Sequence, residues 1–241
     1  MRNFGFMEMR SDLMVSVVLA AYKGEKFIAQ QVSSILSQLG EGDELVISDD
    51  YPEGETYNAI KDIIENDSRV RYIHGKGQGL IKNFEHAIEN AQGDYIFLSD
   101  QDDVWIDGKV QAVMAEFQNG ADVVMHDADI VDGNLKPTGE TAFKLNGAGT
   151  GIIKNIVKNS YQGSCMAFRA DMKKYILPLP ENIPMHDQWI GLMGEKHGRV
   201  SIINKSYLLY RRHGENASGN GSSLSQKIRW RIAIIGCILR K

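Results

Sequence analysis

The sequence predicts an α/β fold with a mostly parallel central sheet and helices on its faces. Short apolar runs alternate with segments whose apolar residues recur at helical spacing, and this order implies parallel strands joined by crossover helices. Three predicted strands end in polar or acidic residues, at Tyr22-Lys23, Asp49-Asp50 and Asp100 to Asp103. Because ligands bind beyond the carboxyl ends of parallel strands, we expect these residues to gather at one edge of the sheet.

The composition limits the class of protein. A chain of 241 residues with 43% hydrophobic and 24% charged residues fits one large globular domain or two small ones. Its formal net charge of -4 argues against nucleic-acid binding. The two cysteines, Cys165 and Cys237, have no metal-ligand spacing, so a reducing, cytoplasmic location is the simpler expectation. No signal peptide is predicted in Met1 to Asp12, and the apolar run Leu13 to Ala21 is too short to span a bilayer.

Strands and helices alternate through the first half of the chain. Apolar runs predict strands at 13–21, 44–48, 70–74, 95–99 and 123–125. Apolar residues at three- and four-residue steps predict helices over 26–39, from Ala59 to Ile64, from Phe84 to Ala91 and from Val110 to Phe117. The glycine-rich segment 75–79 lacks the spacing of a dinucleotide-binding loop, so a turn is predicted there and not a phosphate cradle.

The second half is less periodic. Its Gly, Thr, Asn and Lys content predicts a mobile connection at 133–151, and a linker is predicted at 214–225. Between them the pattern predicts a strand at 161–168, a short helix at 170–176, a helix at 187–196 and one or two strands at 200–209.

The tail 227–241 is apolar, with basic ends and a tryptophan. This composition suits a helix lying on an anionic membrane surface. A terminal helix packed on the domain or on a partner explains it equally well, so both interpretations stay open.

Three carboxylates follow the predicted strand 95–99, at Asp100, Asp102 and Asp103. Unpaired carboxylates are costly to bury, so such a cluster belongs at a solvent-facing strand end where a cation neutralises it. Our hypothesis is that Asp100 and Asp102 hold a divalent metal that in turn holds a diphosphate. The alternative is a polar turn in which Asp103 caps the following helix.

Several segments together carry a family resemblance. They are Val15 to Ile28, Ser33 to Gln38, Asp49-Asp50, Gly93-Asp94-Tyr95 leading into Asp100 to Asp103, His186 to Trp189, and Tyr210 to Asn216. In this order they resemble family 2 glycosyltransferases, in particular the rhamnosyltransferase-like branch, over about residues 13 to 218. One departure is Tyr51-Pro52 after the acidic pair, where members commonly carry Gly-Ser.

The resemblance implies a GT-A fold with a nucleotide-binding part over about 13–132, an acceptor-binding part over about 133–218, and a linker and tail at 219–241. It implies an enzyme that transfers a sugar, with rhamnose as one candidate, from a dTDP or UDP donor with inversion at the anomeric carbon. The implied acceptor is a glycan or lipid-linked glycan in surface polysaccharide biosynthesis. A cytoplasmic location follows, with peripheral membrane contact through the tail as one option.

The resemblance also assigns the metal ligands and the base. Mn2+ or Mg2+ is the expected cofactor, with Asp102 as a direct ligand and His213 as a further ligand. A solvated loop histidine is the alternative for His213. Asp187 matches the position of the catalytic base on the acceptor hydroxyl. Its alternative role is a helix N-cap, and the two roles are compatible.

The remaining candidates contact the donor or the acceptor. The donor set is Ala20, Tyr22, Glu25, Asp49, Asn83, Asp100, Gln101 and Arg211. In this set Tyr22 and Asp49 are expected at the nucleobase, and Arg211 is expected to neutralise phosphate together with Arg212. Strand-terminating and surface roles are the alternatives. The acceptor set is Gln162, Gly163, Ser164 and Trp189.

Two other functions stay open. A nucleotidyltransferase also uses carboxylate-held metal, but the loop Ala20 to Gly24 is a poor match for the Gly-rich basic loop of such enzymes. A non-catalytic assembly protein that binds sugar nucleotides is supported by the Tyr51-Pro52 departure.

Overall fold

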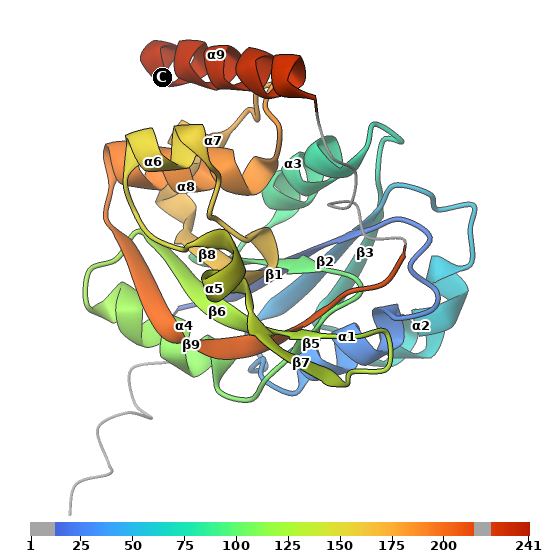
Figure 1. Ribbon diagram of the computed structural model, residues 1–241. Helices are drawn as coiled ribbons and strands as arrows, with labels where there is room; N and C mark the ends of the chain where they lie inside the picture. Colours follow the sequence, from blue (N-terminus) through green and yellow to red (C-terminus); the bar gives the residue numbers. More distant parts are fainter. Residues whose placement is uncertain (1–12, 215–222) are drawn as a thin grey trace, which may run out of the picture.

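The computed structural model describes residues 13–214 and 223–241 (Figure 1). The segment considered for a signal peptide, Met1 to Asp12, lies outside the described residues. The same holds for Glu215-Asn216 at the end of the last motif and for most of the predicted linker 214–225.

A nine-stranded sheet has the strand order β3-β2-β1-β4-β8-β6-β9-β5, with β7 paired to β6. Its first four strands are parallel: β1 (Val15–Ala21), β2 (Glu44–Asp49), β3 (Val70–His74) and β4 (Tyr95–Asp100). The other strands on this path are β8 (Met166–Arg169), β6 (Val123–Val131), β9 (Val200–Arg211) and β5 (Val104–Trp105). β8 runs antiparallel to both of its neighbours, whereas β6 and β9 are parallel. The predicted α/β fold with a mostly parallel sheet is confirmed.

Crossover helices cover the sheet. They are α1 (Ile28–Leu36), α2 (Thr56–Asn66), α3 (Leu80–Asn90) and α4 (Lys109–Gln118). All residues of β1 and β2 are buried, as expected for parallel strands with helices on both faces. The later helices α6 (Ile152–Val157), α7 (Lys173–Ile176), α8 (His186–His197) and α9 (Leu224–Arg240) lie together at one end of the molecule, at the top of Figure 1.

The structure corrects two predictions in the second half. The segment 133–151 is not only a connection, because it contains β7 (Pro137–Thr141), paired with β6, and α5 (Ala142–Asn146). The strand expected at 161–168 begins only at Met166, after a 3-10 turn at Gly163–Cys165. These elements have three to five residues, too few to show a period in the sequence.

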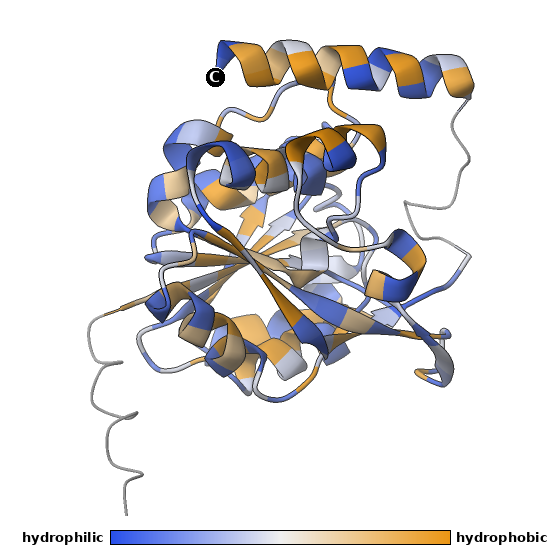
Figure 2. Ribbon diagram, turned by 60° about the vertical axis from the view of Figure 1, so that its left-hand side comes forward, coloured by the Kyte–Doolittle hydropathy of each residue, from blue (hydrophilic) through white to orange (hydrophobic). Residues whose placement is uncertain are grey.

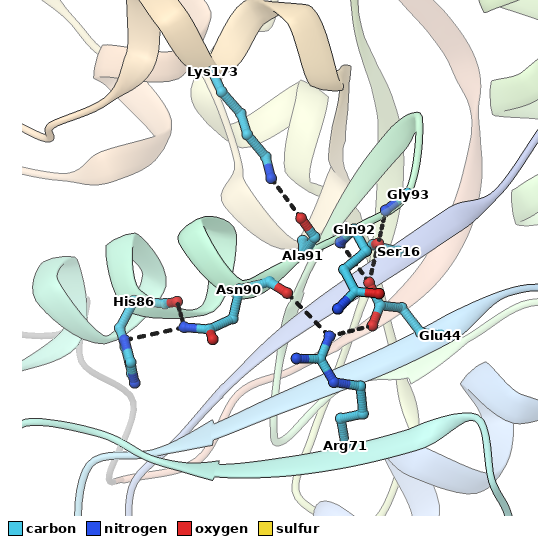
Figure 3. A network of polar contacts seen from close by, with 9 residues as sticks. All are labelled: Ser16, Glu44, Arg71, His86, Asn90, Ala91, Gln92, Gly93 and Lys173. Atoms are coloured by element: carbon cyan, nitrogen blue, oxygen red, sulfur yellow. Dashed lines mark hydrogen bonds and ion pairs between the residues drawn. The ribbon is translucent and has the colours of Figure 1, made fainter.

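A polar network fixes the amino ends of β1, β2 and β4, at the edge of the sheet opposite the acidic turn (Figure 3). The Glu44 carboxylate accepts hydrogen bonds from Ser16 Oγ (2.6 Å), Gln92 N (2.6 Å) and Arg71 Nη1 (2.5 Å). Burial opposes ionisation of Glu44, but these donors hold its pKa below the usual value. Gly93 N also donates a hydrogen bond to Ser16 Oγ, so the network ties the residues just before β4 to β1.

Candidate active site

The carboxyl ends of β1, β2 and β4 bring the predicted donor residues together. Ala20, buried in β1, is opposite Asp100 on β4, and Ala21 is opposite Asp49 on β2. This edge is where ligands bind in open parallel sheets. Glu25 follows β1 and is exposed to solvent. The sequence-predicted residues at these three strand ends therefore share one edge.

Gln101 joins the segments that follow β1 and β4. Its side-chain amide accepts a hydrogen bond from Tyr22 N (2.9 Å) and donates one to Tyr22 O (2.9 Å). A Cβ atom on Gly24 would overlap this amide, so a side chain there would displace Gln101 from Tyr22. Gln101 thus fixes the backbone of Tyr22, which is predicted to contact the sugar-nucleotide donor. The motif alone did not reveal this role of Gln101.

Two exposed tyrosine rings, Tyr22 and Tyr51, lie just after the carboxyl ends of β1 and β2. Tyr22 and Tyr51 have ring centroids 5.9 Å apart, and Lys23 Nζ lies 5.3 Å from one centroid and 5.2 Å from the other. Tyr51 is the residue at which the sequence departs from the family pattern. The departure places a second aromatic ring beside the expected nucleobase position.

Asp49 and Asn83 are engaged within the protein. Asp49 accepts hydrogen bonds from Tyr51 N (3.0 Å) and from the Tyr72 hydroxyl (2.5 Å). Asn83 Nδ2 donates to Ala21 O (3.0 Å) and Ser48 O (2.8 Å), so it links the ends of β1 and β2. Asp49 is fully buried, so neither of its oxygens is exposed to solvent, and both amide hydrogens of Asn83 are used.

The glycine-rich loop encloses the neighbouring carboxylate. Asp50 accepts hydrogen bonds from Gly77 N (2.8 Å) and Gly79 N (2.6 Å). Backbone N–H groups that serve an internal carboxylate in this way are not free for phosphate. The arrangement agrees with the interpretation of 75–79 as a turn.

The acidic turn after β4 meets the segment that follows β9. His213 Nε2 lies 2.8 Å from Asp102 Oδ2, and the His213 ring packs at 4.9 Å from the Phe27 ring. Asp103 is fully buried and accepts a hydrogen bond from Arg211 N (3.0 Å). It does not cap the next helix, because α4 begins after Gly108.

The Arg211 side chain connects the acidic turn after β4 to other parts of the chain. Its Nε donates to Asp102 O (2.7 Å), its Nη1 to Gly133 O (2.8 Å) and its Nη2 to Gln30 Oε1 (2.6 Å). The side chain is buried, so the structure corrects the expectation that Arg211 presents its charge to phosphate. Arg212 is the exposed member of the pair.

Sequence reasoning missed Lys109, which is fully buried behind the acidic turn. Its Nζ donates to Ser164 O (2.8 Å) and lies 4.0 Å from the Trp105 ring centroid. Burial lowers the pKa of Lys109 to about 8, and the charges of Asp103 and Asp100 oppose this shift. Burial also raises the pKa of Asp103 well above its usual value, together with the charges of Asp102 and Asp100. A lysine at a helix start is normally exposed, so no sequence signal marked it.

Asp187 lies in the first turn of α8 and is nearly buried. Its Oδ1 accepts hydrogen bonds from Gln188 N (2.5 Å) and from Asn159 Nδ2 (3.0 Å). Burial raises the pKa of Asp187 to about 6, although these hydrogen bonds favour the carboxylate. Met185 occupies the N-cap position, so the alternative role of Asp187 as the N-cap is wrong. Asn159 was not identified from the sequence, because a single loop asparagine carries no pattern.

Asp187 is also close to the acidic turn. Burial raises the pKa of Asp100 to about 7, and the charges of Asp102 and Asp187 add to this effect. The carboxylate expected to act as the base and the carboxylates expected to face the diphosphate therefore influence one another electrostatically.

The acceptor candidates divide into two groups. In the first group, Gln162, Gly163 and Ser164, the contact with Asp187 is made by Gly163: a Cβ atom there would lie 3.5 Å from Asp187 Cβ and 2.8 Å from His186 Nε2. Trp189 is fully buried, and its indole N–H donates to Ile176 O (2.8 Å). Trp189 therefore belongs to the core, like the rest of the buried segment 186–194 of α8.

His186, beside Asp187, stacks on Phe84 with a ring-centroid distance of 3.9 Å. Burial lowers the pKa of His186 to about 3, so its ring is neutral. Both ring nitrogens are buried without a hydrogen-bond partner.

Within residues 13–214 and 223–241, no group of three or more His, Cys, Asp or Glu side chains is arranged to hold a metal ion. The pair formed by Asp102 and His213 offers one carboxylate and one imidazole. A divalent ion bound to a diphosphate takes its remaining ligands from phosphate oxygens and water. The two side chains fit such a shared ion.

Comparisons with known proteins agree with this architecture. The model of "Glycosyl transferase family 2" matches residues 16–176. An uncharacterized glycosyltransferase of Nostoc sp. is 24% identical over 88% of this chain and 69% of its own length. The UDP-Glc:alpha-D-GlcNAc-diphosphoundecaprenol beta-1,3-glucosyltransferase WfgD of Escherichia coli is 27% identical over 51% of this chain and 49% of its own length.

The fold is similar to that of a solved structure. Staphylococcus aureus TarS 1-349, in complex with UDP-GlcNAc, aligns with a TM-score of 0.73 and 20% identity, covering 94% of this chain and 67% of TarS 1-349. The GT-A architecture expected from the resemblance is confirmed by this similarity. Since the family model covers most of the chain, the chain belongs to glycosyl transferase family 2.

Proposed function

We propose that the protein transfers a sugar from a nucleoside diphosphate donor to a hydroxyl of a glycan acceptor, with inversion at the anomeric carbon. The observation that carries the proposal is the placement of Asp187. It comes from α8 in the second half of the chain, yet it lies against Gly163, whose turn packs on β4, the strand that ends in Asp100. A base on α8 and an acidic turn suited to a diphosphate would then share one reaction space. The halves 13–132 and 133–218 are the proposed donor and acceptor parts.

The donor side is formed by the ends of β1, β2 and β4. Tyr22 and Tyr51 would flank the nucleobase, next to the buried Asp49 at the end of β2. Asp102 and His213 would hold Mn2+ or Mg2+, which supplies Lewis-acid stabilisation of the leaving diphosphate. Arg211 keeps the turn that carries Asp102 in place.

The chemistry assigned to this chain's residues is proton removal and orientation. Asp187 takes the proton of the acceptor hydroxyl while that oxygen bonds to the anomeric carbon and the bond to the diphosphate breaks on the opposite face. A pKa of about 6 leaves Asp187 ionised and still basic at neutral pH. Asn159 orients the carboxylate, and Gly163 lets the acceptor-side backbone approach it.

A lipid-linked glycan is the proposed acceptor class. The E. coli relative and a Campylobacter jejuni relative, 22% identical over 87% of this chain, are both named for transfer to sugars on a diphosphoundecaprenol or PP-undecaprenol carrier. The proposed setting is polysaccharide biosynthesis at the inner face of a membrane. No helix in the described part of the chain is long and apolar enough to cross a membrane.

The test measures nucleoside diphosphate release from a panel of UDP, GDP and dTDP sugars, including dTDP-rhamnose, with Mn2+ or Mg2+ and a lipid-linked acceptor. The wild type is compared with Asp187→Asn and with Asp171→Asn, a matched change at an exposed carboxylate. We expect release by the wild type and Asp171→Asn only. Pyrophosphate release would instead identify a nucleotidyltransferase, and binding without turnover would identify a non-catalytic protein.

A further inference from the structure

The helix α9 is firmly packed on the body of the protein along one side. On this side its own residues Ile234 and Ile238 are buried. Three lysine or arginine side chains join α9 to backbone carbonyls: Lys196 to Ile238 O (2.6 Å), Arg231 to Val157 O (2.6 Å) and Lys241 to Leu177 O (2.7 Å). The tail is therefore a packed terminal helix, as one of the two sequence interpretations held.

A second side of α9 is also apolar. Its exposed residues are Leu224, Ile228, Ile232, Ile235 and Leu239. They recur at steps of three and four residues, so they form one stripe along the helix, and orange residues accordingly recur along α9 in Figure 2. Leu239 is 79% exposed and Ile232 67%. A helix needs a single apolar stripe to pack on a domain, so the second stripe has no partner among the described residues.

The neighbouring helix α6 extends this surface. Ile153 is 80% exposed and Val157 is 56% exposed, and α6 touches α9 at the same end of the molecule (Figure 1). We call the exposed residues of α6 and the outer stripe of α9 the α6–α9 face. Two helices far apart in sequence thus contribute apolar side chains to one end of the protein, which exceeds the scattered exposure normal for a soluble surface.

Charge separates this end from the rest of the chain. Segments 151–158 and 223–241 contain seven basic and no acidic residues, although the whole chain has a formal net charge of -4. On α9, Arg229 and Arg240 flank one side of the apolar stripe and Lys227 and Arg231 the other, by helical position. An apolar stripe bordered by lysine and arginine complements the interface of a bilayer that contains anionic lipids.

A groove lies beside this face, between α6 and α9. A cavity of about 470 Å3 between α6 and α9 is lined by Trp230 and Arg231 at one side and by Asn159 and Gln188 at the other. Asn159 donates a hydrogen bond to Asp187. The cavity therefore extends from α9 to Asn159 and Gln188, the two residues that hydrogen-bond the Asp187 carboxylate.

We propose that the α6–α9 face docks the protein on an anionic lipid bilayer and that the groove beside it admits the membrane-anchored acceptor. The role of the groove rests on the proposed function, whereas docking does not. Docking explains why the outer stripe of α9 is apolar and its borders basic, and it orients the site toward the membrane surface.

The test is sedimentation of the full chain with vesicles of phosphatidylcholine alone or of an equimolar mixture with phosphatidylglycerol. We expect binding to the mixed vesicles that weakens as salt is raised. The double variants Ile232→Ser/Leu239→Ser and Arg229→Gln/Arg240→Gln should each lower partitioning by about tenfold. Lys144→Gln/Leu145→Ser, a matched exposed pair on α5, should bind like the wild type.

Nucleoside diphosphate release from the donor, measured without vesicles, separates the two proposals. Unchanged partitioning of both α9 variants, or equal binding to both kinds of vesicle, would overturn docking even if the protein releases nucleoside diphosphate. A dimer that disappears only in the α9 variants, without vesicle binding, would assign the face to a second copy instead. Vesicle binding without turnover would leave docking intact and overturn the proposed function.

Discussion

His213 Nε2 lies 2.8 Å from Asp102 Oδ2, although 111 residues separate them. The contact exists because β9 ends beside the turn after β4, and Arg211 bonds that turn through its backbone and its side chain. The two residues predicted from separate motifs as metal ligands are therefore adjacent in the fold.

The adjacency predicts coupled effects of mutation. Asp102→Asn and His213→Ala should each weaken Mn2+-dependent donor binding by at least about tenfold, because each removes one protein ligand of a shared ion. The double variant should lose little more than either single variant, since the remaining ligand binds poorly alone. Titration calorimetry with UDP in the presence and absence of Mn2+ measures this. Full metal-dependent affinity in Asp102→Asn would remove the assignment.

The burial of Asp187 predicts a pH profile. Asp187→Asn should lower kcat by about 10²–10⁴-fold while donor binding is retained. In the wild type, kcat/KM should rise with pH through about 6, because the base acts in its ionised form. Asn159→Ala removes a hydrogen bond to that ionised form, so the pKa of Asp187 should rise and the acidic limb should move to higher pH. An acidic limb that stays in place in Asn159→Ala would contradict this link.

The buried guanidinium of Arg211 predicts a loss of stability. Arg211→Met leaves Gln30 Oε1 and the carbonyl of Gly133 without their donor, which should cost about 1–3 kcal/mol in the free energy of unfolding. Arg212→Met, at the exposed neighbour, should change it by less than about 0.5 kcal/mol. Urea denaturation compares the two. Equal stability of both variants would show that Arg211 does not hold the turn.

The sequence predicts the sheet and the acidic turn well because both have local causes. Long buried strands such as β1 produce continuous apolar runs, and the carboxylates that follow β4 lie next to one another in the chain. β5 and β7 have no such signal. They contain two and five residues, too few to show a period in the sequence, and they form because a neighbouring strand supplies hydrogen-bond partners.

The partners of the site residues depend on tertiary contacts instead. Nothing in the sequence shows that the Arg211 guanidinium donates hydrogen bonds to Gln30 and Gly133. Nor does the sequence show that Lys109 is buried behind the acidic turn. Trp189 follows Asp187 by two helical positions, and only the packing of α8 decides which of them faces the site. Residue type and motif order could therefore predict which segments meet at the carboxyl ends of the strands, whereas the burial and partners of each side chain come from tertiary packing.

The network around Glu44 predicts sensitivity to acid (Figure 3). Because the folded-state pKa of Glu44 is lowered, its contribution to stability is present above the ordinary pKa and is lost as the pH falls through the folded-state value. Glu44→Gln should therefore lower the free energy of unfolding by about 1–3 kcal/mol at neutral pH and by less in acid. Denaturation at several pH values measures this, with the exposed Glu65→Gln as the control. An equal loss at all pH values would contradict the titration argument.

The exposed pair of Tyr22 and Tyr51 predicts how the departure from the family pattern affects the donor. If the two rings flank the nucleobase, Tyr51→Ala should raise the KM for the donor about threefold to tenfold with little change in kcat, because a stacking contact is made equally in the ground and transition states. Tyr51→Phe keeps the ring and should behave like the wild type. Steady-state kinetics with the preferred donor tests both. A lower kcat with unchanged KM in Tyr51→Ala would place Tyr51 outside the nucleobase site.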